Sequence, residues 1–171
     1  MELKEALIKR RSIRKYDTTK QISEEQLRYI LFAGMSAPIS HKAYKNIKIT
    51  VVQDKKVLKE IADTFGNGGD PLYGVPTLII ISTKPDPVKN IEYFNVACMV
   101  QNMMLAAADK ELGSIYLTAF LDKIQDNPEI LQAIGAGTGY KPLSAVGVGY
   151  KLDFSEYTAE QIEKRIEIIR T

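Results

Sequence analysis

A run of basic residues near the N-terminus carries the strongest chemical signal in this sequence. Arg10, Arg11 and Arg14 fall within five positions, with Ser12 between them. A guanidinium group donates paired hydrogen bonds that match two phosphate oxygens, and a hydroxyl adds a neutral donor. The run therefore predicts a site for a phosphate monoester, and the alternative is a solvated basic turn.

No self-sufficient set of catalytic side chains accompanies this run. His41 is the only histidine and Cys98 the only cysteine, which argues against a Cys/His zinc site and excludes an intramolecular disulfide. We expect Cys98 to be a small buried residue, because its neighbours in the sequence are apolar. Neither a Walker loop nor a G-x-G-x-x-G turn in the right context is present. A phosphate clamp without a catalytic set indicates that a bound cofactor carries the reaction.

Composition narrows the class of protein. The chain has 171 residues, of which 45% are hydrophobic and 26% charged, as in one folded domain spanning 1–171. Its net charge of +2 argues against general nucleic-acid binding, which relies on an excess of Lys and Arg. The N-terminus lacks the apolar core of a signal peptide, and no apolar stretch is long enough to span a bilayer. We expect a cytoplasmic protein that binds neither nucleic acid nor membranes.

Periodicity and capping signals divide the chain into helices and strands. Helices are expected at residues 2–10, 23–35, 54–62, 90–110, 127–134 and 158–170. Strands are expected at residues 47–53, 75–82, 113–117 and 143–150. The stretch 90–110 is apolar around most of its circumference, so we expect a central buried helix there. The fold class is α+β, with a central mixed or antiparallel sheet of about four strands flanked by about six helices.

Five segments resemble, in the right order, the motifs of the nitroreductase family of flavoproteins. They are the basic run at 10–16, an Ala-Pro-Ser-like loop at 36–40, a central helix with Gln-Asn before Leu-Ala-Ala at 97–107, a Leu-Gly-Ser strand and loop at 112–120, and a Gly-Tyr-x-Pro turn and last strand at 139–150. The resemblance covers most of residues 1–150. It implies the nitroreductase-like fold.

The resemblance also implies a homodimer that binds FMN at the interface between its subunits. The residues implied in cofactor binding are Arg10, Arg11, Ser12, Arg14, Pro38, Ile39, Ser40, Asn67, Thr118 and Ala119. The first four would hold the phosphate and ribityl chain, with some reaching the pyrimidine edge. The loop of Pro38, Ile39 and Ser40 would come from the other subunit and pack near the dimethylbenzene end. Thr118 and Ala119 would present backbone N–H groups near the reactive N5, and Asn67 is either a flavin contact or a plain loop residue.

The function implied by the resemblance is electron transfer. Members of the family pass electrons from NADH or NADPH to nitroaromatics, quinones or related acceptors, which react in turn in a ping-pong mechanism. No side chain is expected to act as a catalytic acid or base, because the cofactor carries the chemistry. The alternative is a protein of the same fold that binds flavin or another phosphorylated ligand without significant turnover.

Two of the departures from the family pattern bear on the cofactor site and on the dimer. The family's Asn-x-Gln-Pro-Trp segment is replaced at 41–46 by His-Lys-Ala-Tyr-Lys-Asn. Lys42 or Lys45 is a candidate to replace the lost polar contacts, since a positive charge favours an anionic reduced flavin or substrate. The family's arm around the partner subunit is also missing, so the expected helix at 158–170 either packs on its own subunit or makes a smaller dimer contact.

Overall fold

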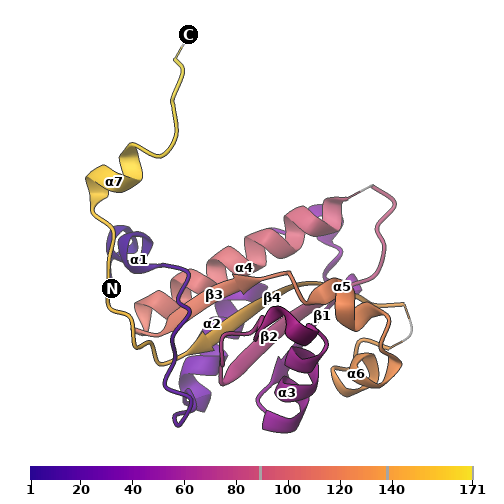
Figure 1. Cartoon of the computed structure of the whole chain (residues 1–171). Coiled ribbons are helices and arrows are strands. Elements are labelled where there is room, and N and C mark those ends of the chain that lie inside the picture. The colour runs from indigo at the N-terminus through magenta and orange to yellow at the C-terminus, as the bar shows by residue number, and fades with distance from the viewer. Residues whose placement is uncertain (89, 138, 171) are drawn as a thin grey trace.

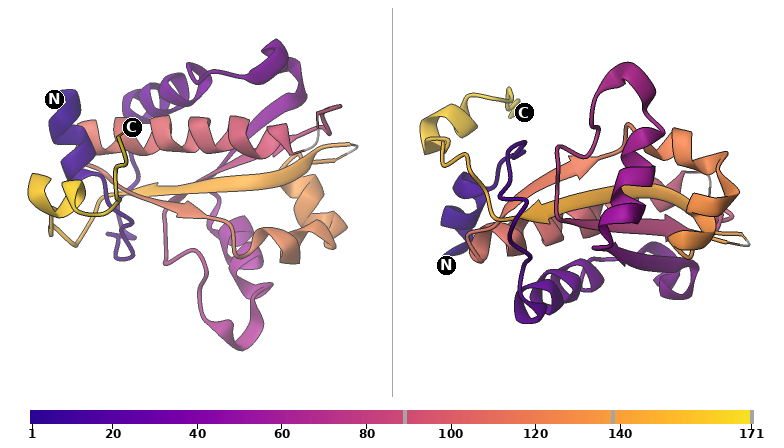
Figure 2. Two further views of the ribbon diagram at one scale, coloured as in Figure 1. Left: turned by 90° about the horizontal axis from the view of Figure 1, so that it is seen from above. Right: turned by 60° about the horizontal axis from the view of Figure 1, so that its bottom comes forward.

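The computed structural model of the chain describes residues 1–88, 90–137 and 139–170, apart from the side chain of Asn67. Its strands form a four-stranded antiparallel sheet with the order β1-β2-β4-β3, and helices cover both faces (Figures 1 and 2). The strands are β1 (Ile47–Val52), β2 (Thr77–Thr83), β3 (Gly113–Leu117) and β4 (Lys141–Gly149). The helices are α1 (Leu3–Lys9), α2 (Glu24–Met35), α3 (Lys55–Asp63), α4 (Ile91–Asp109), α5 (Leu121–Gln125), α6 (Pro128–Ala133) and α7 (Ala159–Glu163). The predicted α+β fold is confirmed.

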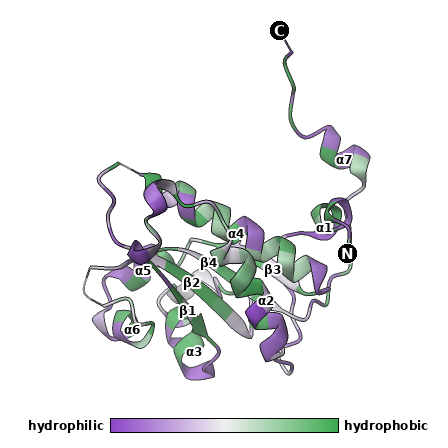
Figure 3. Ribbon diagram, turned by 180° about the vertical axis from the view of Figure 1, so that it is seen from behind, coloured by the Kyte–Doolittle hydropathy of each residue, from purple (hydrophilic) through white to green (hydrophobic). Residues whose placement is uncertain are grey.

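The two central strands are apolar on both sides because both faces of the sheet are covered. Every residue of β2 is buried, and β4 is buried from its second residue onward. Ile79 of β2 lies opposite Val146 of β4, and Ile115 of β3 lies opposite Gly147 of the same strand. Figure 3 shows the hydrophobic colouring along the sheet strands. Side chains of alternate residues point to opposite faces, so the sheet separates the core into two clusters.

One cluster lies under α2 and α4, and the other under α3, α5 and α6. Ile79 and Val146 belong to the first, together with Met103 of α4. Ile80 and Ala145, their neighbours along the strands, belong to the second. The two helical layers are seen above and below the sheet in the left panel of Figure 2. Each face therefore carries its own helical layer, and each can present its own cavity.

The helix starts predicted from capping residues are confirmed. Ser23 and Gln26 form a reciprocal capping box at the start of α2. Asp54 accepts hydrogen bonds from Lys56 N and Val57 N at the start of α3. These contacts satisfy N–H groups that a helix start leaves unpaired, which explains why a local sequence signal located the starts. The short helix α5 was missed, because it carries no side-chain cap.

The prediction of a helix over 158–170 is wrong. Only α7, Ala159–Glu163, is helical, and none of its residues is buried. Beyond it the chain extends away from the body, as Figure 1 shows. Ile166 and Ile169 are 78% and 80% exposed. A short amphipathic helix needs an apolar surface to pack on, and these isoleucines find none on their own chain.

Helix α4 is the central helix that the sequence predicts, with nine buried residues, but one side of it is exposed. Met103 and Val100 are buried, whereas Phe94 is 66% exposed. Cys98 is exposed on the same helix, which corrects the expectation that this cysteine is buried. Phe32 of neighbouring α2 is also 67% exposed. We call Phe32, Met35, Phe94 and Cys98 the outer face of α2 and α4. None of the helices in the described residues combines the length and hydrophobicity needed to cross a bilayer.

Replacement of Gly149 by Ala is expected to destabilise the sheet. A Cβ at this position would lie 2.7 Å from Pro76 Cδ, and the proline ring cannot rotate away. We expect Gly149→Ala to lower the free energy of unfolding in urea by about 1–3 kcal/mol, the usual cost of overpacking. The control is Gly137→Ala, because a Cβ at Gly137 meets no atom within 4 Å. Equal losses in both variants would contradict this account.

Candidate cofactor-binding site

The N-terminal basic run is attached to the edge of the sheet. Ile13 N donates a hydrogen bond to Ser114 O of β3 at 3.0 Å, and Ser12 forms a parallel bridge with Ser114. The side chain of Ile13 enters the core and is only 3% exposed. Because alternate residues of an extended segment face opposite ways, Ser12 and Arg14 point outward. Both are exposed, as a ligand-binding pair must be.

Tyr16 fixes the end of this segment. Its side chain is 5% exposed, and its hydroxyl donates to Ile13 O at 2.8 Å. An antiparallel bridge joins Tyr16 to Lys151 just beyond β4. Burial raises the pKa of the Tyr16 phenol well above its usual value near 10. The segment from Ser12 to Tyr16 is therefore held at both ends, which fixes where Arg14 emerges.

Arg14, Thr118 and Ala119 line one cavity of about 260 Å³. Its opposite wall comes from the segment before β2, including Phe65 and Tyr73. The Arg14 guanidinium lies over the Tyr73 ring, 5.5 Å from its centroid. Within the described residues, the backbone N–H groups of Thr118 and Ala119 donate no hydrogen bond to a protein acceptor. The cavity thus combines a cation with two available backbone donors.

The other two arginines of the run lie elsewhere. Arg11 hydrogen-bonds to the Ser155 hydroxyl and lies over the Tyr157 ring, 4.5 Å from its centroid. Arg10 is half-buried at the end of α1, where its backbone N–H donates to Ala6 O at 2.9 Å. Of the three arginines, only Arg14 lines the cavity shared with Thr118 and Ala119. Contacts with the C-terminal segment therefore hold Arg11 away from this cavity.

The loop of Pro38, Ile39 and Ser40 lies on the opposite face of the sheet. Ile39 lines a separate cavity of about 340 Å³ with residues of α2, β1 and α4, including Met99. Ser40 N donates to Asn95 Oδ1 at 3.0 Å, and Asn95 is only 6% exposed. Within one chain, this loop therefore does not meet the cavity of Arg14. That separation is what the resemblance implies if the loop serves the partner subunit.

Comparison with known proteins decides the family. The model of the nitroreductase family matches residues 7–71 and 66–150. The chain belongs to the nitroreductase family. Membership in that family identifies the chain as an oxidoreductase. No curated protein matches the chain.

Several solved structures are similar to this member of the nitroreductase family over its whole length. A nitroreductase with bound FMN from Bacteroides fragilis NCTC 9343 shares 28% identity with a TM-score of 0.80, covering 99% of this chain and 100% of that chain. One with bound FMN from Desulfitobacterium hafniense DCB-2 shares 18% identity with a TM-score of 0.82, at 99% and 100% coverage. An FMN-dependent nitroreductase from Clostridium difficile R20291 shares 22% identity with a TM-score of 0.81, at 99% and 99% coverage. The last two likenesses concern the fold.

Reasoning from sequence assigns no role to two residues of this nitroreductase-family chain. Asn95 holds the 38–40 loop through Ser40 N, and its one signal is a polar residue within an apolar helix. Tyr73 covers Arg14, and no sequence pattern marks it. The side chain of Asn67 lies outside the described residues. Lys42 and Lys45 are exposed, and their proposed contacts with flavin stay predictions.

The buried phenol of Tyr16 predicts a change in stability at high pH. Because the folded state raises its pKa above the ordinary 10.0, the contribution of Tyr16 is complete below about pH 10 and is lost as pH rises further. Urea unfolding should therefore show wild-type stability falling more steeply above pH 10 than that of Tyr16→Phe. Near neutral pH the variant should be less stable by about 1 kcal/mol, through loss of the bond to Ile13 O. Parallel curves above pH 10 would contradict the assignment.

Proposed function

We propose that this chain is an FMN-dependent oxidoreductase that passes electrons from NADH or NADPH to a nitroaromatic, quinone or similar acceptor. The observation that carries the proposal is the cavity that Arg14, Thr118 and Ala119 line together, because the N–H groups of the last two have no protein acceptor among the described residues. A flavin mononucleotide needs a cation for its phosphate and backbone donors for its ring, so these residues fit it. Bound FMN supplies the redox chemistry, with donor and acceptor reacting in turn.

In this proposal the protein binds and orients, and no side chain needs to transfer a proton. Arg14 and Ser12 would hold the phosphate by charge-assisted and neutral hydrogen bonds. Arg11 could join them only by leaving Ser155 and Tyr157. The carboxylate of Asp70 lines the cavity, but it already accepts from Leu72 N at 2.8 Å and Gly74 N at 2.6 Å. Preorganised donors near the ring stabilise negative charge that develops on reduction.

A homodimer completes this arrangement. Ile39 and Arg14 lie on opposite faces of the sheet, so a site that contains both must use two chains. The outer face of α2 and α4 supplies exposed apolar residues next to the 38–40 loop, and such patches mark interfaces. The exposed isoleucines after α7 bury nothing on their own chain, which favours a contact with the partner. Most soluble homo-oligomers are two-fold dimers.

The visible spectrum of the purified protein tests the function. After addition of FMN and removal of the excess, the protein should retain the flavin bands. Anaerobic NADH or NADPH should bleach them, and a quinone or nitroaromatic should restore them. Flavin bands that neither nucleotide bleaches would show a flavin-binding protein without turnover. A colourless protein would refute the proposed cofactor.

Removal of the Arg14 guanidinium should weaken FMN binding. A hydrogen bond to a charged group contributes about 1.5–3 kcal/mol, so Arg14→Ala should raise the Kd roughly 10- to 150-fold. Quenching of flavin fluorescence on binding measures this change. The control is Lys56→Ala, because Lys56 pairs with Glu60 on the exposed side of α3, outside the cavity and the outer face. An unchanged Kd in Arg14→Ala would remove Arg14 from the site.

A charge placed on the outer face should disrupt the dimer. Sedimentation should give wild-type protein twice the chain mass of 19.2 kDa. Phe94→Glu should shift the protein to the monomer and lower flavin retention, because a buried unpaired carboxylate is costly. Gln132→Glu on α6 adds the same charge on the opposite layer and should leave the dimer intact. A wild-type monomer that still retains FMN would show that one chain suffices.

A further inference from the structure

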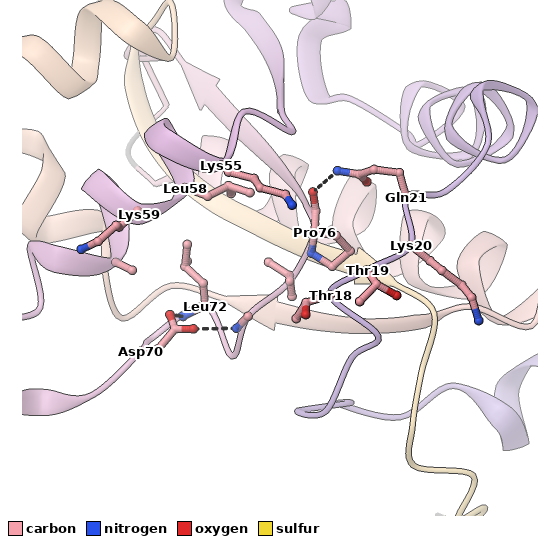
Figure 4. A pocket seen from close by; sticks show the side chains of 13 residues that line it. Thr18, Thr19, Lys20, Gln21, Lys55, Leu58, Lys59, Asp70, Leu72 and Pro76 are labelled. Atoms are coloured by element: carbon pink, nitrogen blue, oxygen red, sulfur yellow. Dashed lines mark hydrogen bonds between the residues drawn. The ribbon is translucent and has the colours of Figure 1, made fainter.

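A separate cavity of about 440 Å³ lies between α3, the segment 18–21 and the segment 70–76 (Figure 4). Leu58 of α3 lines it from one side, and Leu72 and Val75 from another. Arg14, Thr118 and Ala119 do not line this cavity. Asp70 lines both this cavity and the cavity of Arg14. Its volume lies within the range of small-molecule sites in proteins.

The floor of this cavity is apolar and rigid. Leu72 and Val75 are 2% and 3% exposed, so packing in the core beneath the cavity fixes their side chains. Pro76 is held by Gln21, whose side-chain Nε2 donates to Pro76 O at 2.8 Å. The Oε1 of Gln21 accepts from the Thr77 hydroxyl at 2.9 Å. Because the polar atoms of Gln21 and Pro76 are already paired with each other or with Thr77, this part of the cavity offers mainly apolar contact to a ligand.

The charge at the mouth is concentrated on one lysine. Lys20 pairs with Asp17 at 3.0 Å, and Lys59 pairs with Asp63 at 2.6 Å. Figure 4 shows both lysines pointing away from the centre, whereas Lys55 extends across the mouth toward Pro76 and Gln21. In the part of the chain that the structure describes, Lys55 has no ion-pair partner.

In the described part of the chain, the carboxylates around this cavity already have partners. Among the described residues that line the cavity, Asp70 is the one carboxylate, and its oxygens accept from Leu72 N and Gly74 N. The hydroxyl of Thr18 also lines the cavity and forms no side-chain hydrogen bond within the described residues. One unpaired ammonium and one hydroxyl above an apolar floor are complementary to a single small anion on an apolar body.

We propose that this cavity binds an apolar monocarboxylate, a small organic acid with one carboxylate on a compact hydrocarbon or aromatic body. The body would lie on Leu58, Leu72 and Val75, and the carboxylate would bind Lys55 and the Thr18 hydroxyl. A phosphate would be matched less well, because a group with up to two negative charges over several oxygens favours arginine forks or several backbone donors. The site is distinct from the proposed flavin site, and its existence does not depend on the redox function.

Equilibrium dialysis with 2-naphthoate tests this site on the protein as purified. We expect saturable binding, and at least tenfold weaker binding of the uncharged analogue 2-naphthylmethanol. Lys55→Gln should weaken 2-naphthoate by about tenfold or more, the scale of a charged hydrogen bond. Ala62→Phe should abolish binding by filling the cavity that Ala62 lines. The matched control is Lys56→Gln, since Lys56 is outside the cavity and its side chain is 85% exposed.

Two outcomes would overturn the proposal. One is equal binding of 2-naphthoate by wild type, Lys55→Gln and Ala62→Phe, which would assign the ligand to another surface. The other is no saturable binding by wild type. A change in the visible flavin spectrum that persists in both variants would report the flavin cavity instead. Because the readout is ligand binding rather than turnover, failure here leaves the proposed redox function untouched, and the reverse also holds.

Discussion

The backbone hydrogen bond from Ile13 to Ser114 fixes the position of the basic segment that we propose for cofactor binding. It attaches an extended basic segment to the edge strand β3, so the same strand that positions Arg14 also leads into the loop of Thr118 and Ala119. Burial of Ile13 and Tyr16 holds the segment in one register. Without this attachment, the arginines would belong to a mobile terminus, and the backbone donors after β3 would face no cation.

The elements that the sequence predicts well are those with local causes. The capping box of Ser23, the cap of Asp54 and the apolar stretch of β2 are decided by neighbours in the sequence. The failures involve surfaces that are not local. Ile166 and Ile169 of the 158–170 segment have helical spacing, but they are 78% and 80% exposed. Cys98 has apolar neighbours in sequence, yet the stripe it occupies faces away from the sheet.

The basic run was recognised by its composition, but composition does not assign a direction to each side chain. Pairing with β3 sends Arg14 outward toward Tyr73, while Arg11 turns to Ser155 and Tyr157. Tyr73 lies in a turn and has a positive φ, a conformation that no local sequence pattern predicts. The sequence thus predicts the kind of chemistry at the candidate site, whereas the shape of that site depends on contacts between distant segments.

The strand order has a consequence for how the chain folds. Strand β4, at 141–149, is the last to be synthesised, yet it lies between β2 and β3. Strand β3 pairs with no other named strand among the described residues, so the edge that carries the N-terminal segment cannot form until β4 arrives. Pairings between distant segments are slow to form, because loop closure costs entropy first. On the ribosome, the arginine-bearing segment emerges long before β4 and cannot dock on β3 until β4 has followed.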